Sequence, residues 1–149
     1  MVRIALDTSV LVYAEGFGDA VRCHRAREIV GALPVSALVV PIQCLGELHR
    51  VLTGKMGRTP RSAQQAILDW TQSALTADTT HTAMMAATHL ACDHSVSWWD
   101  AVILAVSAEA RCRALLSEDF HHGFRWQGTV VLNPFREETD ESLRALLQG

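Results

Sequence analysis

Short apolar runs typical of strands alternate along this chain with longer segments typical of helices. The strand patterns cover residues 2–6, 35–40, 114–116 and 129–132. The helical patterns cover residues 10–14, 19–31, 42–54, 60–77, 79–94, 101–110 and 138–147, and a turn at 94–97 and a loop at 121–128 are expected between them. Strands that alternate with helices favour parallel pairing, because each parallel pair needs a long crossover. The sequence therefore predicts an α/β fold with a mainly parallel sheet.

The length and composition are those of one globular domain. At 149 residues, with 49% hydrophobic and 19% charged residues, the chain can bury a core and is not typical of a disordered protein. We expect a single domain over residues 1–149, since no repeat or linker is visible. The formal net charge of −3 argues against a protein that coats nucleic acid through a broad basic surface.

Membrane insertion, disulfides and zinc are not indicated. No apolar run approaches the roughly 18 residues of a membrane span, so we expect a cytoplasmic protein. The four cysteines are scattered and form no CxxC pair, so neither a disulfide framework nor a structural zinc site is expected.

Four acidic residues fall where a parallel sheet gathers its ligands. Asp7 directly follows the first strand, Asp119 follows the third, Asp100 opens the helix before that strand, and Glu47 lies in the helix after the second. Ligands bind at the carboxyl ends of parallel strands, so these side chains are able to converge at one edge. Clustered carboxylates repel one another and normally require a hard cation such as Mg²⁺ or Mn²⁺. Such a cation can activate water against a phosphodiester, which makes nucleic-acid cleavage the first hypothesis.

Two of these carboxylates also have simple structural interpretations. Asp7 stands before Thr8 at a helix start and is a candidate N-cap. Ser97 and Asp100 have the spacing of a capping box, in which each side chain bonds a backbone N–H of the first turn.

The other two carboxylates have alternatives as well. Glu47 lies off the apolar stripe of its helix and is a candidate partner of Arg50. Asp119 is a candidate turn residue, with its neighbour Glu118 as a competitor for any functional role. Alternation along the strand end places Ser117 on the same side as Asp119, where it could hydrogen-bond a carboxylate.

Basic and aromatic residues could contact RNA. Lys55, Arg58 and Arg61 lie in one connector, which is either a solvated loop or a phosphate-binding edge. Trp98 and Trp99 precede Asp100; core packing is the favoured interpretation, and an exposed Trp99 could instead stack on a base.

Several segments resemble one known family. The segments are IALDTSVLVY, CLGELHRVL, SVSWWDAVILAVSAEARCRALLSEDFHHG and VVLNPF. In order, spacing and flanking residues they resemble the PIN-domain ribonucleases, and within that family the VapC-type toxins of bacterial toxin–antitoxin pairs. The resemblance covers nearly the whole chain. It implies a three-layer α/β/α fold with a central, mainly parallel sheet.

The resemblance assigns roles to individual residues. The metal-binding and catalytic carboxylates would be Asp7, Glu47, Asp100 and Asp119. Ser9 and Ser117 match hydroxyl positions that orient these ligands, and Glu118 stays outside the set. The implied activity is cleavage of RNA by a water activated by Mg²⁺ or Mn²⁺, which leaves a 3′-hydroxyl and a 5′-phosphate.

The resemblance also implies partners. VapC-type toxins usually form homodimers and are silenced by a small antitoxin; we expect its groove near residues 42–54 and 60–77. The alternatives are a PIN-domain nuclease of rRNA or tRNA processing outside a toxin pair, or a non-catalytic PIN scaffold. A haloacid-dehalogenase-like phosphotransferase is disfavoured, because Ser9 stands where that pattern needs a second Asp. A receiver-like phosphoacceptor is disfavoured because its adjacent acidic pair is missing.

Overall fold

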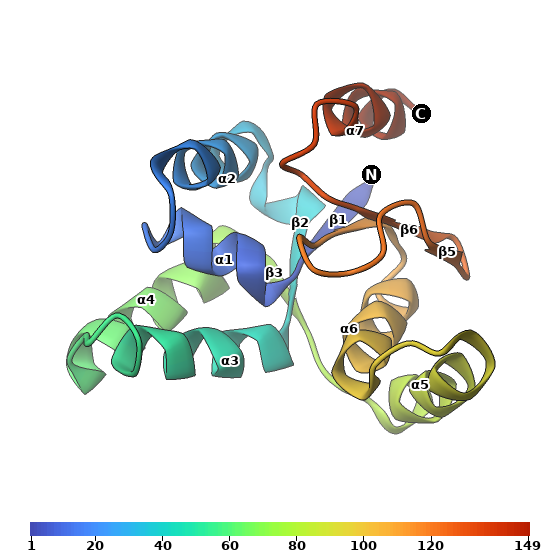
Figure 1. Cartoon of the computed structure of the whole chain (residues 1–149), viewed down its shortest axis with the longest axis horizontal. Helices are drawn as coiled ribbons and strands as arrows, with labels where there is room; N and C mark the ends of the chain where they lie inside the picture. The colour runs from blue at the N-terminus through green and yellow to red at the C-terminus, as the bar shows by residue number, and fades with distance from the viewer.

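Six strands form one sheet in the order β3-β2-β1-β4-β6-β5 (Figure 1). The computed structural model describes all residues from 1 to 149. The strands are β1 (Arg3–Leu6), β2 (Leu38–Pro41), β3 (Leu75–Ala77), β4 (Cys112–Leu116), β5 (Arg125–Trp126) and β6 (Thr129–Leu132). Every neighbouring pair is parallel except β5 with β6, which is antiparallel. The predicted mainly parallel sheet is confirmed.

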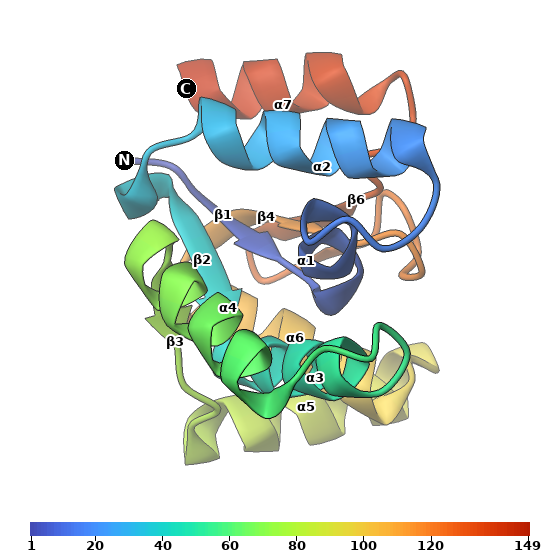
Figure 2. The same cartoon turned by 90° about the vertical axis from the view of Figure 1, so that its left-hand side faces the viewer.

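Helices cover both faces of this sheet. They are α1 (Thr8–Ala14), α2 (Ala20–Ala32), α3 (Ile42–Thr53), α4 (Pro60–Ser73), α5 (His81–His94), α6 (Trp98–Glu109) and α7 (Thr139–Gln148). Figure 2 shows α2 and α7 on one side of the sheet and α3, α4, α5 and α6 on the other. An ion pair between Arg25 and Asp140 joins α2 to α7. The expected three-layer α/β/α arrangement is thus confirmed. None of the helices combines the length and apolar character needed to cross a bilayer.

Helix α6 packs beneath the centre of the sheet. Its seven consecutive residues 101–107 are all buried, as expected for a helix surrounded by protein. It contacts β2, β4 and β6. The one polar side chain in this stretch, Ser107, donates to the carbonyl oxygen of Ile103 at 2.7 Å, so its burial leaves no hydroxyl unsatisfied. The packing of α6 therefore fixes its first turn, which carries Asp100.

The end of the helix predicted over residues 60–77 is wrong. Helix α4 stops at Ser73, and Ala74 is extended, with φ −152° and ψ 158°. The next three residues form β3, which pairs in parallel with β2. Leu and Ala favour helices locally, but the backbone hydrogen bonds that β2 offers outweigh that preference. A local pattern contains no information about this edge of the sheet.

Three smaller boundaries also differ from the prediction. Residues 35–37 form a 3₁₀ turn, and β2 begins only at Leu38. Helix α6 begins at Trp98, three residues earlier than predicted. The predicted loop 121–128 contains β5, which folds back on β6 through Gln127 and Gly128, with φ 45° and 85°. Two positive φ values give a hairpin turn whose twist matches the strands.

Enlarging a buried residue of α6 should destabilise the protein. Ala105 is 2% exposed, so Ala105→Leu is expected to lower the free energy of unfolding by about 1–3 kcal/mol, because the added methyl groups have no room. Ala145 of α7 is exposed, and Ala145→Leu is the matched control, with a change within about 0.5 kcal/mol. Urea unfolding of both variants measures the difference. Equal stabilities would contradict tight packing of α6 beneath the sheet.

Candidate functional site

Asp7 lies at the carboxyl end of the central strand β1. Its backbone N–H donates to the carbonyl oxygen of Leu116 at 3.0 Å, which continues the pairing of β1 with β4. The carboxylate accepts two hydrogen bonds of 2.7 Å, one from the backbone N–H of Thr8 and one from the hydroxyl of Ser117. Asp7 is thus the N-cap of α1, as one interpretation predicted. The expected hydrogen bond from Ser117 to a carboxylate is also present. Asp7 therefore caps α1 with Oδ1 and accepts from Ser117 with Oδ2.

The environment of Asp7 is unfavourable for a negative charge. Burial is the largest effect and raises the pKa of the Asp7 carboxyl, while the hydrogen bonds from Ser117 and Thr8 lower it. The negative charges of Asp100 and Glu47 raise it further. These three carboxylates are therefore close enough to repel one another across the carboxyl edge of the sheet.

Cys44 belongs to this site although the sequence analysis did not single it out. Its sulfur lies 3.6 Å from Oδ1 of Asp7. Burial, and next the charge of Asp7, raise the pKa of the Cys44 thiol well above its usual range, so the thiol keeps its proton and donates to the carboxylate. The available signal was its position three residues before Glu47, which puts both on one side of α3.

Glu47 faces α1 and not the solvent. Its Oε2 accepts a 2.6 Å hydrogen bond from the hydroxyl of Thr8. The predicted alternative, a pair with Arg50, is wrong: Arg50 is exposed and forms no ion pair with Glu47, which is half-buried against α1. Thr8 thus bonds both carboxylates: its backbone N–H donates to Asp7, and its hydroxyl donates to Glu47.

Glu118 is bonded to side chains of α1 and α2. Its carboxylate accepts from the hydroxyl of Tyr13 at 2.7 Å and from Nε of Arg22 at 2.6 Å. Burial, and next the bond to Glu118, raise the pKa of Tyr13 to about 12. The backbone N–H of Glu118 donates to the hydroxyl of Ser9 at 3.3 Å. Ser9 therefore contacts the loop that carries Asp119 and makes no bond to a carboxylate.

Asp100 and Asp119 face a common hollow. They line a cavity of about 370 Å³ together with residues 94–97, Phe120, His121 and Phe124; we call it the Asp100–Asp119 hollow. Asp100 is half-buried in the first turn of α6, and Asp119 is exposed. The capping box predicted for Ser97 and Asp100 is not formed, because Ser97 stands at the N-cap but its side chain makes no cap hydrogen bond.

The four carboxylates do not form a metal-ligand cluster in this side-chain arrangement. No three His, Cys, Asp or Glu side chains lie close enough together to hold a metal ion. Asp7 and Glu47 instead accept hydrogen bonds from hydroxyl groups. The donor set still fits a hard cation in kind, because it consists of carboxylate oxygens that gather around a half-buried edge. Asp100 lies near both Asp7 and Asp119: its charge acts on Asp7, and it lines the same hollow as Asp119.

One of the three predicted RNA-contacting cations has a structural role. Arg58 donates through Nη1 to Oε2 of Glu15 at 3.0 Å and through Nη2 to the Glu15 carbonyl oxygen at 3.1 Å. Glu15 also accepts from Nε1 of Trp70 at 2.9 Å. Arg58 thus connects the loop before α4 to α1, and this pairing with Glu15 occupies the guanidinium that was predicted to contact a phosphate. Lys55 and Arg61 are exposed and form no ion pair.

Both tryptophans at the start of α6 are exposed. Trp98 is 39% and Trp99 is 54% exposed, so the favoured interpretation of core packing is wrong for both. The core beneath the sheet is filled instead by the smaller residues 101–107 of α6. Trp99 therefore presents an aromatic surface one residue before Asp100.

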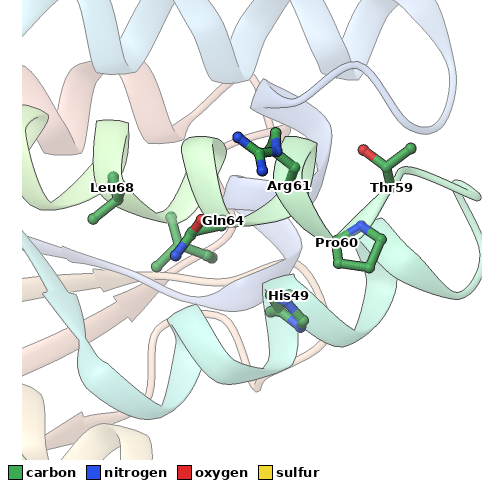
Figure 3. A pocket seen from close by; sticks show the side chains of 7 residues that line it. His49, Thr59, Pro60, Arg61, Gln64 and Leu68 are labelled. Atoms are coloured by element: carbon green, nitrogen blue, oxygen red, sulfur yellow. The ribbon is translucent and has the colours of Figure 1, made fainter.

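A second hollow lies away from the carboxylates, between α3 and α4 (Figure 3). It has a volume of about 770 Å³, and we call it the α3–α4 hollow. Its lining residues are His49, Thr59, Pro60, Arg61, Gln64, Ile67 and Leu68. Apart from Thr59, these residues lie on the two segments where a partner groove was expected. Size alone does not identify the functional site here, because no acidic residue lines this hollow.

Comparison with known proteins identifies a family. The family model described as PIN domain matches residues 4–124. No curated protein sequence matches the chain significantly.

Solved structures share the fold. A structure of Mycobacterium tuberculosis VapC20, described as a sarcin–ricin loop cleaving toxin, has 21% identity and a TM-score of 0.65 over 78% of this chain and 91% of that one. A toxin–antitoxin complex from Klebsiella pneumoniae has 16% identity and a TM-score of 0.68 over 89% and 98%. DNA-bound VapBC from Salmonella typhimurium has 13% identity and a TM-score of 0.68 over 90% and 99%. At these identities the likeness is one of fold.

Removing the Arg58 side-chain charge should destabilise the protein. Arg58→Gln is expected to lower the free energy of unfolding by roughly 1–3 kcal/mol, because Glu15 loses its charged partner in a half-buried setting. Arg61→Gln, which removes an exposed and unpaired charge from the same connector, should change it by less than about 0.5 kcal/mol. Chemical denaturation of the two variants compares them directly. A stable Arg58→Gln variant would return this residue to the candidates for RNA binding.

Proposed function

The chain belongs to the PIN domain family, and on that premise we propose that it is a divalent-metal-dependent endoribonuclease and the toxin of a toxin–antitoxin pair. In this proposal residues 1–149 are a single PIN domain that acts in the cytoplasm. The solved structures with the same fold support it, since they are of a toxin or of toxin–antitoxin complexes.

The observation that carries the proposal is the set of hydroxyl-bound carboxylates at the carboxyl edge of the sheet. Ser117 fixes Asp7, and Thr8 fixes Glu47, at distances of 2.7 and 2.6 Å. Strands β1 and β4 run side by side here, with β2 on the other side of β1, which is the crevice position where open α/β sheets bind ligands. A merely structural edge would not need several carboxylates that repel one another.

The acidic residues would hold Mg²⁺ or Mn²⁺, both of which prefer oxygen ligands. The proposed ligands and catalytic residues are Asp7, Glu47, Asp100 and Asp119. When bound, such an ion supplies positive charge to a phosphate and lowers the pKa of a coordinated water. Ser117 keeps one oxygen of Asp7 in a fixed direction, and Ser9 holds the backbone beside Asp119 through the N–H of Glu118. Hydrolysis of RNA here would leave a 3′-hydroxyl and a 5′-phosphate.

RNA would lie across the exposed start of α6 and the connector before α4. Lys55 and Arg61 are proposed to contact phosphates, since they are exposed and unpaired, and cations position a backbone without reading its sequence. Trp99 is proposed to stack on an unpaired base. Arg58 is not part of this surface.

The proposed protein partners are a small antitoxin and a second copy of the chain. An antitoxin segment is proposed to bind in the α3–α4 hollow, whose volume of about 770 Å³ and mixed lining suit an inserted helix or side chain. The toxin–antitoxin complex with the same fold supports a partner of this kind.

Two other functions remain alternatives. A PIN-domain nuclease of rRNA or tRNA processing would use the same residues without an antitoxin, and a short antitoxin-like reading frame directly upstream separates the two. A non-catalytic scaffold would bind neither metal nor RNA at the carboxylates. The occupied acidic positions favour an enzyme over the scaffold.

Cleavage of RNA should depend on a divalent ion and on Asp100. The purified chain, free of antitoxin, is expected to cut total cellular RNA into discrete fragments with Mn²⁺ or Mg²⁺ and not with EDTA. Asp100→Asn should reduce the rate by about 100-fold or more, because a ligand charge is lost next to Asp7. Asp93→Asn, an exposed aspartate on α5, is the matched control and should keep full activity. Gel analysis of the fragments measures the rates.

Different negative results of this assay lead to different conclusions. Full activity in Asp100→Asn would remove the carboxylate mechanism. Intact RNA, together with no binding of Mn²⁺ in calorimetry, would favour the scaffold. Intact RNA with Mn²⁺ bound in wild type and lost in Asp100→Asn would leave the metal site in place and direct the search to other RNA substrates.

The partner should depend on the α3–α4 hollow. When the chain is co-expressed with the small protein of an adjacent reading frame, the two are expected to co-purify. Leu68 lines the hollow and is 48% exposed, so Leu68→Glu should abolish co-purification by placing a charge in the apolar contact. Leu147→Glu on α7, where the wild-type leucine is 42% exposed, should not. Retention of the partner by Leu68→Glu would exclude this hollow as its site.

A further inference from the structure

Aromatic rings form one wall of the Asp100–Asp119 hollow. The ring of Phe124 lies between two others: its centroid is 5.5 Å from that of His94, at 77°, and 6.0 Å from that of Phe120, at 36°. His121 adds a further ring to the lining. His94 and His121 are exposed, so part of this aromatic wall is open to a ligand.

Hydroxyl groups without partners line another side of the hollow. Ser95 ends α5 in the left-handed conformation, with φ 54°, and Ser97 precedes α6; both are exposed. Neither hydroxyl forms a hydrogen bond within the protein. They are donors and acceptors available to a ligand beside the aromatic wall.

We propose that the Asp100–Asp119 hollow binds one unpaired nucleobase of single-stranded RNA next to the phosphate that is cleaved. The inference rests on the proposed ribonuclease function and specifies its substrate. Single-stranded RNA is recognised by bases that stack on aromatic side chains and bond through their edges. The hollow offers both features, and its volume of about 370 Å³ falls at the small end of ligand pockets.

The charge of the hollow decides which part of the RNA enters it. Asp100 and Asp119 are proposed ligands of the cation, so their end of the hollow is left to the metal and the cleaved phosphate. A base is uncharged and can instead stack on the aromatic wall and bond the hydroxyls of Ser95 and Ser97 through its edge. Since the same two carboxylates belong to the proposed catalytic centre, a base in the hollow would hold its own phosphodiester beside that centre. The competing occupant is a cationic side chain of a protein partner.

The test measures RNA binding without cleavage. The full chain is titrated, in EDTA at low ionic strength, with fluorescein-labelled oligouridylate decamers, alone or annealed to oligoadenylate. One uridine is replaced by 5-iodouridine for photo-crosslinking. The single strand should bind more tightly than the duplex, and crosslinks should map to the peptide that contains Phe120, His121 and Phe124.

Variants of the exposed rings test the aromatic wall. The double variant His94→Ala/His121→Ala should weaken binding of the single strand about tenfold, because stacking contributes on the order of 1–3 kcal/mol per base. His121→Phe keeps a ring and should bind like the wild type. His89→Ala, which removes an exposed histidine of α5 outside the hollow, is the control.

Two results would overturn the inference. One is unchanged affinity in the double variant, and the other is crosslinking confined to peptides outside the hollow; either would leave the hollow to a cationic group of a protein partner. The outcome is independent of the cleavage assay. Crosslinks in the hollow without any RNA cleavage would support a base-binding site and count against the nuclease, and metal-dependent cleavage with no crosslink there would do the reverse.

Discussion

The hydrogen bond from Ser117 to Asp7 connects the architecture of this protein to its chemistry. It joins the carboxyl ends of β1 and β4, the two central strands, at 2.7 Å. Ser117 is completely buried and Asp7 is half-buried, and a carboxylate withdrawn from water is costly unless its lone pairs are satisfied. Ser117, Thr8 and Cys44 supply the donors, one each from the loop after β4, the start of α1 and the first turn of α3. The convergence of these three elements on Asp7 sets where Glu47 can lie, and the packing of α6 sets the position of Asp100.

The partners of each carboxylate also explain why neighbouring acidic residues have different roles. Glu118 and Asp119 are adjacent, but the first is bonded to Tyr13 and Arg22 on the side of α1 and α2, and the second is exposed in the hollow. An ion pair with Arg22 neutralises the charge of Glu118, whereas the donors to Asp7 are all uncharged and leave its negative charge available to a cation. Glu15 is a parallel case, since Arg58 and Trp70 occupy its oxygens. Acidic residues of this chain are therefore distinguished by their donors and not by their distance from the sheet.

The sequence predicted the features that follow from local patterns and missed those that depend on distant partners. The strand before Asp7, the helix after Pro41 and the bond from Ser117 follow from apolar runs, a proline at a helix start and alternation along a strand. Strand β3 was missed because it is supported by pairing with β2, which lies 36 residues earlier: Val40 pairs with Thr76. Glu47 had no periodic signal, and its proposed role rested mainly on the family resemblance. The role of Arg58 was invisible because Glu15 lies 43 positions away.

The distribution of charges limits how the proposed RNA substrate would bind. The net charge is −3, and Arg22 and Arg58 are paired with Glu118 and Glu15. The proposed RNA surface keeps only Lys55 and Arg61 as unpaired cations, whereas binding dominated by phosphate neutralisation grows with the number of phosphates contacted. In the proposed function, affinity would then come from stacking and from a cation held by the carboxylates, which are short-range interactions. A chain organised in this way would discriminate RNA by unpaired bases at the cleavage point, and its binding would depend only weakly on salt, in contrast to a protein that coats nucleic acid.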